Sequence, residues 1–265
     1  MTPPPSIWLH TWLQATLSAP YVLHSLSGGS SNTLYRVECP TQSYVLRVNA
    51  PSTLAFSVNR LCEAKVLELI QPYPWAVQII RNDVPQGLCL MQAYEPVPQA
   101  LSQTALLSLP QTLAELQSIT IPIADVTLLT IDYTQLTAQY QTLLERFPSP
   151  LAQALLTEWR EKLSTLPRLP PVLVHHDLHL GNVCQNTTRA HPFVLIDWEY
   201  AGLGNAWFDA VALVTWGLDP QHLRTLPAFQ HVTAQQWQAG LQSAKRLNQV
   251  LAELWYWARG HAQEQ

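Results

Sequence analysis

The chain has 265 residues, of which 48% are hydrophobic and 12% are charged, and its formal net charge is −4. This length and composition are typical of a compact protein with a large apolar core. The negative charge argues against a nucleic-acid partner. No apolar run is long enough to cross a membrane, and the first residues lack the pattern of a signal peptide, so we expect a cytoplasmic protein without membrane insertion. The sequence identifies no protein partner.

Cysteine usage agrees with that compartment. Cys39, Cys62, Cys89 and Cys184 are far apart in the chain, without the close pairs of a zinc motif. We therefore expect reduced thiols rather than a disulfide framework.

The first half of the chain predicts a small sheet with one helix. Alternating apolar residues bounded by turn residues predict strands over residues 21–26, 34–37, 44–48, 77–81 and 88–91. Apolar residues recur at helical spacing over residues 61–70, which predicts a helix between the third and fourth strands.

A short polar loop connects the first two strands. Paired glycines let the backbone approach an anion closely, and exposed amides with serine hydroxyls can hold phosphate oxygens. The same composition is also that of an ordinary turn, so both interpretations stay open. The loop does not match the Walker A pattern. Its residues are Ser27, Gly28, Gly29, Ser30 and Ser31.

The second half of the chain predicts mainly helices. Apolar residues at three- and four-residue spacing indicate helices over residues 111–119, 133–147, 151–163 and 234–257. Prolines separate several of these segments and also precede the most informative part of the sequence.

Three polar residues with the spacing of a phosphoryl-transfer site follow two short apolar strands. Asp177 comes after the strand 172–174, Asn182 follows five positions later, and Asp197 ends the strand 193–196. An aspartate can orient an acceptor hydroxyl and take its proton, while a carboxylate and an amide oxygen are ligands that suit Mg²⁺. The pattern therefore predicts transfer of a phosphoryl group to an alcohol.

Two other interpretations of this region are less well supported. Asp and Asn are common turn residues, but here each polar element adjoins an apolar strand, as a catalytic loop and a metal loop require. His175, His176 and His179 could suggest a zinc site, but their spacing lacks the helical two-histidine pattern.

Residues 176–182 (HDLHLGN) and 195–202 (LIDWEYAG) resemble the motifs of the aminoglycoside phosphotransferase and choline kinase superfamily. The second motif is most similar to that of bacterial thiamine kinases and small choline or ethanolamine kinases. The resemblance implies an α+β, protein-kinase-like fold of two lobes. Residues 1–93 would form a small nucleotide-binding lobe with an antiparallel sheet, and residues 94–265 a larger, mainly helical lobe with the catalytic and metal loops.

The resemblance also implies ATP and Mg²⁺ as cofactors. Arg47 occupies the place where the family carries a cation that binds the nucleotide phosphates, and Glu63 is its expected partner, with Glu68 as a weaker rival. Residues 92–95 would form the hinge that pairs with the adenine.

Two residues are expected to support the catalytic loop rather than to react. Asp209 resembles the family's acid that holds this loop by hydrogen bonds, and His176 is assigned a similar structural role. Asn205 replaces an Asp that is frequent in the family, which puts a substrate role at this position in doubt.

The acceptor is expected to be a small-molecule alcohol with a positive charge. Asp177, Trp198 and Glu199 are its candidate contacts, because aromatic faces beside a carboxylate bind cationic rings and quaternary ammonium groups. This chemistry favours thiamine or choline over a sugar. Together with the resemblance it leads us to expect thiamine first, then choline or ethanolamine, and then an aminoglycoside. The other candidate wall residues, each also explained as a core residue, are Trp207, Trp237, Trp255, Tyr256 and Trp257.

A nucleotide-binding pseudokinase is the non-enzymatic alternative. Such proteins commonly lack one of the three chemical residues, whereas Asp177, Asn182 and Asp197 are all present here.

Overall fold

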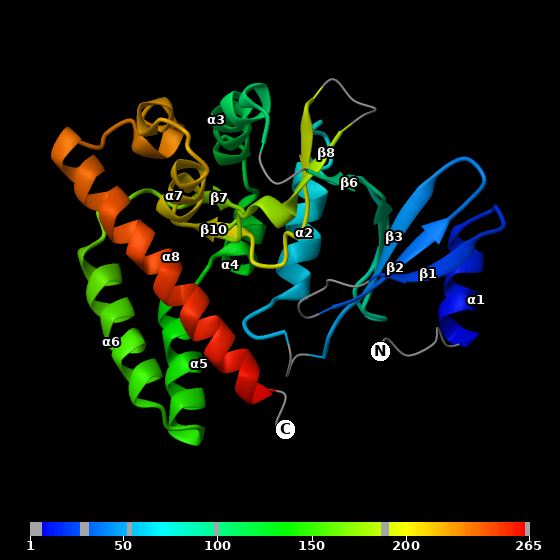
Figure 1. The fold of residues 1–265 in the computed structure, drawn as a ribbon, viewed down its shortest axis with the longest axis horizontal. Coiled ribbons are helices and arrows are strands. Elements are labelled where there is room, and N and C mark those ends of the chain that lie inside the picture. Colours follow the sequence, from blue (N-terminus) through cyan, green and yellow to red (C-terminus); the bar gives the residue numbers. More distant parts are fainter. Residues whose placement is uncertain (1–6, 27–31, 52–54, 98–100, 187–190, 263–265) are drawn as a thin grey trace.

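Five antiparallel strands form one sheet, on the right of Figure 1, in the order β1-β2-β3-β5-β4. Their bounds are β1 Val22–Leu26, β2 Thr33–Glu38, β3 Ser43–Val48, β4 Ile79–Asp83 and β5 Leu88–Gln92. These strands lie close to the expected ranges. The largest difference is in β4, where a register shift between Ile79 and Arg81 lets the strand continue through Asp83, which the sequence suggested as a turn.

The computed structural model describes residues 7–26, 32–51, 55–97, 101–186 and 191–262. The glycine-serine loop predicted over residues 27–31 lies outside the described residues. The Asn32 side chain, which follows it directly, is described.

One face of the sheet is covered by helix α1 (Ile7–Thr16), which is not among the predicted helices. Leu9, Trp12 and Leu13 occur at helical spacing and are buried in a cluster with apolar side chains that alternate along β2, β3 and β5. The Trp12 Nε1–H also donates a hydrogen bond of 2.9 Å to the Asp83 carboxylate. The strand members of this cluster are Tyr35, Val37, Tyr44, Leu46, Leu88 and Leu90.

The opposite face of the sheet is turned toward helix α2 (Arg60–Ile70), which lies between the sheet and the helical part in Figure 1. Because side chains alternate along β3, Arg47 lies on the other face from Leu46 and reaches α2. The Asn59 side chain caps α2 by accepting hydrogen bonds from two backbone N–H groups of the first turn.

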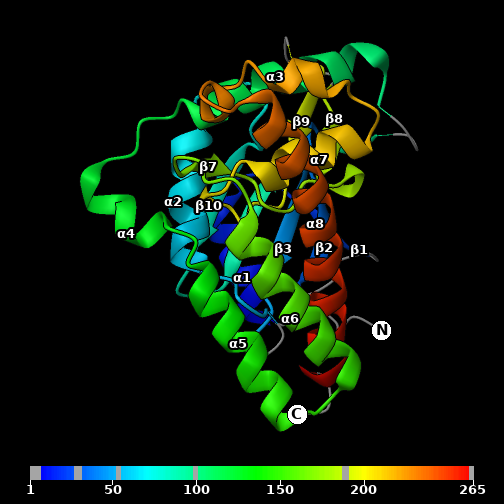
Figure 2. The ribbon, with the colours of Figure 1, turned by 90° about the vertical axis from the view of Figure 1, so that its left-hand side faces the viewer.

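The second half of the chain is mainly helical. The helix bounds are α3 Gln103–Gln117, α4 Val126–Leu129, α5 Tyr133–Arg146, α6 Pro150–Thr165, α7 Trp207–Thr215 and α8 Ala234–Ala262. Short 3-10 helices cover η1 Ile123–Asp125, η2 Leu180–Asn182, η3 Pro220–Leu223 and η4 Pro227–Phe229. Helices α5, α6 and α8 lie side by side (Figure 2).

Helix α3 begins earlier than expected. The sequence predicts its start after Pro110, but the helix runs through this proline from a side-chain cap at Ser102. Proline removes one intrahelical hydrogen bond, and α3 offsets this loss by burying residues such as Leu109 and Leu113 in the large core.

Short strands position the loops of the candidate site. β7 (Val172–Val174) pairs with β10 (Gly202–Gly204), and β8 (Val183–Gln185) pairs with both β9 (Phe193–Leu195) and β6 (Glu95–Pro96). The segment that leaves the sheet is therefore hydrogen-bonded beside the loop that carries Asp177 and Asn182.

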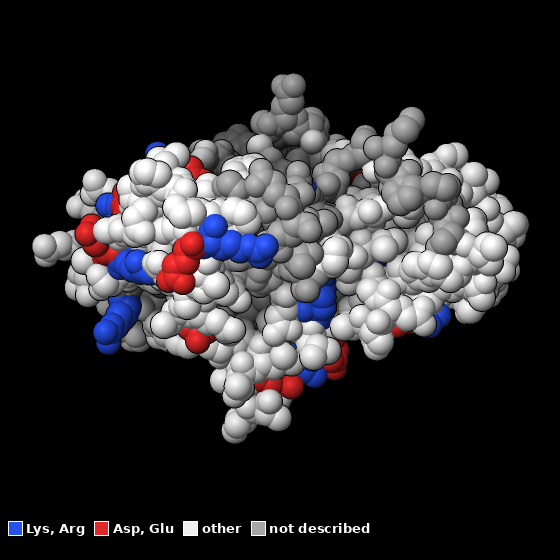
Figure 3. All heavy atoms as spheres, turned by 90° about the horizontal axis from the view of Figure 1, so that it is seen from below, with Lys and Arg blue, Asp and Glu red and all other residues white. Residues whose placement is uncertain are grey.

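These elements confirm the expected α+β arrangement, with an antiparallel sheet in the N-terminal region and helices in the C-terminal part. Among the described residues, no helix is both long and apolar enough to cross a membrane. On the face shown in Figure 3, charged side chains of both signs are interspersed among uncharged ones.

Candidate functional site

Asp177, Asn182 and Asp197 line one cleft, whose volume is about 1320 Å³. The loop after β7 carries Asp177, η2 carries Asn182, and the turn after β9 carries Asp197. The Asn182 side-chain amide donates hydrogen bonds to the backbone oxygen of Asp177 at 2.9 Å and to its Oδ2 at 3.2 Å. The backbone N–H of Ile196 donates to the Asn182 backbone oxygen at 3.0 Å, which ties the two loops together.

Two residues of this site have left-handed backbone conformations. The φ angle is 65° at His176 and 62° at Asp197. Such angles are uncommon outside glycine, and aspartate and histidine tolerate them better than most residues. Strained backbone of this kind gathers at functional sites, where the surrounding contacts hold it in place.

Asp209, in the first turn of α7, holds the start of the catalytic loop. Its carboxylate accepts hydrogen bonds from the backbone N–H groups of His175 at 2.8 Å and His176 at 2.9 Å. Burial raises the pKa of this carboxyl to about 6, although both hydrogen bonds act in the opposite direction. The predicted supporting contact of Asp209 is thus present.

Of the two histidines before Asp177, His175 is buried and His176 is partly buried, and they face different partners. His175 packs against the Trp198 ring, and its Nε2 lies 2.9 Å from the backbone oxygen of Ile196. His176 packs against Phe208, and its Nε2 lies 3.1 Å from the Tyr133 hydroxyl. Burial lowers the pKa of both imidazoles to about 4, so both are neutral at pH 7.

Arg47 and Glu63 form a buried, bidentate ion pair with N–O distances of 2.6 and 2.9 Å. Burial disfavours the charge of both groups, but each partner outweighs this effect: the pKa of Arg47 is raised and that of Glu63 is lowered. One guanidinium nitrogen of Arg47 also lies 3.9 Å from the Asp197 carboxylate. The rival acid, Glu68, pairs instead with Lys65 on the surface of α2.

Arg60 joins this pair to the metal loop, a link that the sequence analysis missed. Its guanidinium donates to Glu63 at 2.8 Å, to Glu199 at 3.0 Å and to the Asn32 side-chain oxygen at 2.9 Å. The Asn32 amide in turn donates to Glu199 at 3.0 Å. Glu199 lines the cleft, but its buried carboxylate is already paired. In the sequence, the only indication of this network is Glu63, which follows Arg60 by three residues and so lies beside it on a helix.

Asp177 and Asp197 bring two carboxyl groups into the cleft, each with only a distant basic partner: His179 at 3.7 Å from Asp177 and Arg47 at 3.9 Å from Asp197. Burial, followed by the nearby charge of Glu199, raises the pKa of Asp197 to about 7. Burial also raises the pKa of Asp177 above its ordinary value. A bound cation would reverse both effects, because it stabilises the ionised forms.

The oxygen atoms of Asn182 and Asp197 suit a hard divalent cation that takes its remaining ligands from elsewhere. The Asn182 amide nitrogen is used by Asp177, which leaves the amide oxygen and the Asp197 carboxylate for a metal. Within the described ranges no three His, Cys, Asp or Glu side chains gather as a metal site. A pair of oxygen ligands agrees with Mg²⁺, which usually takes its remaining ligands from water and nucleotide phosphates.

The expectation that Trp198 contacts the acceptor is wrong. This side chain is fully buried, packs against Trp75 and His175, and donates its Nε1–H to the backbone oxygen of Leu195 at 3.0 Å. The position of Trp198 directly after Asp197 suggested the cleft, but the turn directs its ring into the core.

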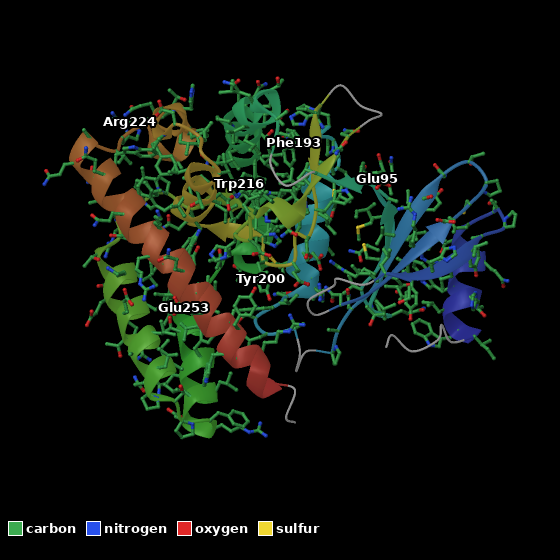
Figure 4. All side chains as sticks on the ribbon, in the orientation of Figure 1. Glu95, Phe193, Tyr200, Trp216, Arg224 and Glu253 are labelled. Carbon is green, nitrogen blue, oxygen red and sulfur yellow. The ribbon has the colours of Figure 1, made fainter. Side chains whose placement is uncertain are left out.

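The other tryptophans expected in the wall divide between core and cleft. Trp207 and Trp237 are buried against each other and against Phe229, so they are core residues. Trp255 lines the cleft and donates to the Tyr200 hydroxyl at 2.9 Å. Figure 4 shows Tyr200 near the middle of the molecule, beside α8. The further aromatic residues of the wall are Phe56, Tyr140, Phe208 and Tyr256.

The sequence matches the model of the phosphotransferase enzyme family over residues 22–247. This match covers most of the chain, so the chain belongs to the phosphotransferase enzyme family. A comparison with curated proteins found no match.

Solved structures confirm the protein-kinase-like fold. The choline kinase LicA from Streptococcus pneumoniae is 18% identical and has a TM-score of 0.74, with 97% of this chain and 91% of that chain covered. An ethanolamine kinase from Plasmodium vivax is 14% identical, with a TM-score of 0.67 and coverage of 94% and 80%. The spectinomycin phosphotransferase APH(9)-Ia, in complex with ADP and spectinomycin, is 13% identical, with a TM-score of 0.66 and coverage of 97% and 87%.

Proposed function

We propose that this protein is an ATP- and Mg²⁺-dependent kinase that transfers the γ-phosphoryl group to a small alcohol. The observation that carries the proposal is the convergence of Asp177, Asn182 and Asp197 in one cleft, with the buried Arg47–Glu63 pair beside Asp197. Phosphoryl transfer depends mainly on positioning and on charge stabilisation, and these residue types supply both.

Each of these side chains has a separate role in the proposal. The Asn182 amide occupies Oδ2 of Asp177, so Oδ1 of Asp177 is left to orient the acceptor hydroxyl and take its proton. Asp197 and the amide oxygen of Asn182 would hold Mg²⁺, which neutralises phosphate charge when bound. Arg47, held in place by Glu63, would bind the nucleotide phosphates.

The cleft supports a cationic acceptor. Four carboxyl groups line it, those of Asp132, Asp177, Asp197 and Glu199, against the two guanidinium groups of Arg60 and Arg259. Aromatic side chains form much of the remaining wall, and ammonium groups bind to aromatic faces by cation–π attraction. This wall suits thiamine and choline alike, and the motif resemblance to thiamine kinases makes thiamine the first acceptor to test, ahead of choline and ethanolamine.

Two alternatives make different predictions. An aminoglycoside kinase would phosphorylate kanamycin rather than a small cation with a single hydroxyl, and a pseudokinase would bind nucleotide without turnover. The presence of both carboxylates and the amide in the cleft favours an active enzyme over a pseudokinase.

Product formation with ATP and Mg²⁺ should be measured by mass spectrometry across thiamine, choline, ethanolamine and kanamycin. We expect a phosphorylated product from one of the first three. The Asp177→Asn variant should bind ATP like the wild type and lose turnover by about three orders of magnitude or more, because both positioning and the base are impaired. Unchanged turnover in this variant would contradict the proposal.

Two further expectations stay proposals. The boundary between a nucleotide-binding part (1–93) and a catalytic part (94–265) is supported by the position of β6 directly after it. A cytoplasmic location is supported by the four free cysteines, since cytosolic proteins rarely form disulfides.

A further inference from the structure

The segment of residues 55–58 crosses from the sheet to the helical part of the molecule. It lies between β3 and α2 in the sequence, and yet all four of its residues line the same cleft as Asp177. The rest of the wall around Asp177 comes largely from α5, α8 and the catalytic and metal loops. The segment is therefore an N-terminal contribution to a predominantly C-terminal site.

Three contacts fix this segment against the helical part. The Phe56 ring packs on the Tyr140 ring of α5, with a centroid distance of 4.8 Å. The Tyr200 hydroxyl donates to the Phe56 backbone oxygen at 3.4 Å, and the Ser57 hydroxyl donates to the Gln139 side chain of α5. The segment is thus attached to the helical part through two of its side chains and through its backbone.

Ser57 has a left-handed backbone, with a φ angle of 62°. Serine adopts this conformation only when neighbouring contacts compensate for the strain. Here the Phe56 ring and the Ser57 hydroxyl are held on α5 on either side of the strained bond. The arrangement fixes the position of the Phe56 ring in the cleft wall.

Tyr200 connects this ring to the reacting groups. It lies three residues after Asp197, and its hydroxyl accepts a hydrogen bond from Trp255 of α8 while it donates to the segment. The segment, the metal loop and α8 therefore meet at one phenol, that of Tyr200, which is labelled in Figure 4. Around this point the wall is aromatic, so its contacts suit the apolar or cationic part of an acceptor rather than a phosphate.

We propose that Phe56 is a specificity-determining residue for the acceptor, and that the Ser57–Gln139 hydrogen bond positions it. This inference rests on the proposed kinase function. The size of the side chain at position 56 sets the room for the acceptor. The nucleotide phosphates are instead expected at Arg47, which is paired on the sheet side with Glu63. Changes at Phe56 therefore alter the KM for the acceptor and leave the KM for ATP unchanged.

The test compares Phe56→Ala and Phe56→Leu with Phe147→Ala, a half-buried phenylalanine at the end of α5 and outside the cleft lining. Steady-state kinetics use ATP and the acceptor that the wild type phosphorylates. We expect Phe56→Ala to raise the acceptor KM by about tenfold, the usual effect of lost contacts in an apolar pocket, with the ATP KM changed less than about twofold. Phe56→Leu should recover part of the loss, and Phe147→Ala should match the wild type.

Gln139→Leu provides a second test. It removes the side-chain oxygen to which the Ser57 hydroxyl donates its hydrogen bond, and it leaves the Phe56 side chain itself unchanged. Its acceptor KM should rise less than that of Phe56→Ala, again without a change for ATP. Thermal unfolding of each variant establishes that it is folded.

The inference would be overturned if folded Phe56→Ala changed both KM values equally, or changed neither of them. The proposed function would still stand in that case, provided that the wild type phosphorylates one of the acceptors. If the wild type phosphorylates none of the four acceptors, the proposed function fails and this inference fails with it.

Discussion

The guanidinium of Arg47 holds the carboxylate of Glu63 through two hydrogen bonds, although these residues are only 5% and 2% exposed. Removing one charge of such a pair leaves the other buried without compensation, which costs more than the pair itself contributes. The ion pair therefore gives a direct test of the proposed role of Arg47 in binding the nucleotide phosphates.

The Glu63→Gln substitution should lower the free energy of unfolding by about 3 kcal/mol, because Arg47 loses its charged partner in a buried position. It should also weaken the binding of an ATP analogue, because Arg47 is no longer oriented. Denaturant unfolding and calorimetric titration would measure the two effects. Glu68→Gln is the matched control on the same helix, where the carboxylate is exposed and should change neither quantity.

The Asp209→Asn substitution tests the support of the catalytic loop. An amide offers one acceptor oxygen instead of two, so one of the backbone N–H groups of His175 and His176 loses its partner. We expect kcat to fall by about a hundredfold as Asp177 is displaced, with little change in the KM for ATP. Asp219→Asn, at the exposed cap of η3, should behave like the wild type. Equal kcat values for both variants would show that the loop does not need Asp209.

Stability should depend on pH through His176, whose pKa burial lowers to about 4 from an ordinary value near 6.5. The folded state holds the neutral imidazole, so its contribution is complete above pH 6.5 and is lost as the pH falls toward 4. Other buried groups titrate in the same range, and a comparison with His176→Asn isolates this residue. Asparagine suits the left-handed backbone at this position.

As the pH falls from 7 to 4, the free energy of unfolding of the wild type should therefore decrease more than that of His176→Asn. The difference between the two decreases should be about 3 kcal/mol across this range. Denaturant titrations at several pH values would measure it, and a difference that stays constant would refute the prediction.

Two glycines of α8 provide a matched pair for packing. A Cβ at Gly240 would lie 2.2 Å from the Trp207 ring, whereas a Cβ at Gly260 would meet nothing within 4 Å. Gly240→Ala should destabilise the protein by about 1–3 kcal/mol, because the buried ring must move. Gly260→Ala should be neutral or stabilising by up to about 1 kcal/mol, because alanine favours the helix. Thermal unfolding of both variants would decide, and the same sign for both would contradict the packing argument.

Local patterns in the sequence predicted much of the fold and part of the site geometry. Alternation along the strands and helical spacing near Glu63 depend only on residues close together in the sequence. The predicted ranges of β3, β5 and α2 are therefore close to those observed. The hydrogen bonds of Asp209 and the Arg47–Glu63 pair also agree with the predictions. The catalytic, metal and cofactor roles of these residues stay predictions.

Other features depend on contacts that no local pattern contains. The Arg60–Glu199 ion pair joins residues 139 positions apart, and neither residue carries a sign of the other in its neighbourhood. Trp198 shows the opposite difficulty: its neighbours in the sequence lie in the cleft, but the left-handed backbone of Asp197 turns its ring into the core. The helical spacing before residue 14 did contain a usable signal for α1, since Leu9, Trp12 and Leu13 share one helical face.

The apolar interior of the molecule has a consequence for Arg47 and Glu63. The sheet face beneath α1 has its own hydrophobic cluster, whereas the buried apolar residues of α2 belong to the large cluster of the helical part. Arg47 is anchored in the sheet and Glu63 in α2, so their ion pair joins the sheet to the large cluster, which Ile79 of β4 and Met91 of β5 also contact. Any displacement of α2 away from β3 would lengthen this ion pair, so the distance between the two side chains reports how closely the helix lies against the sheet.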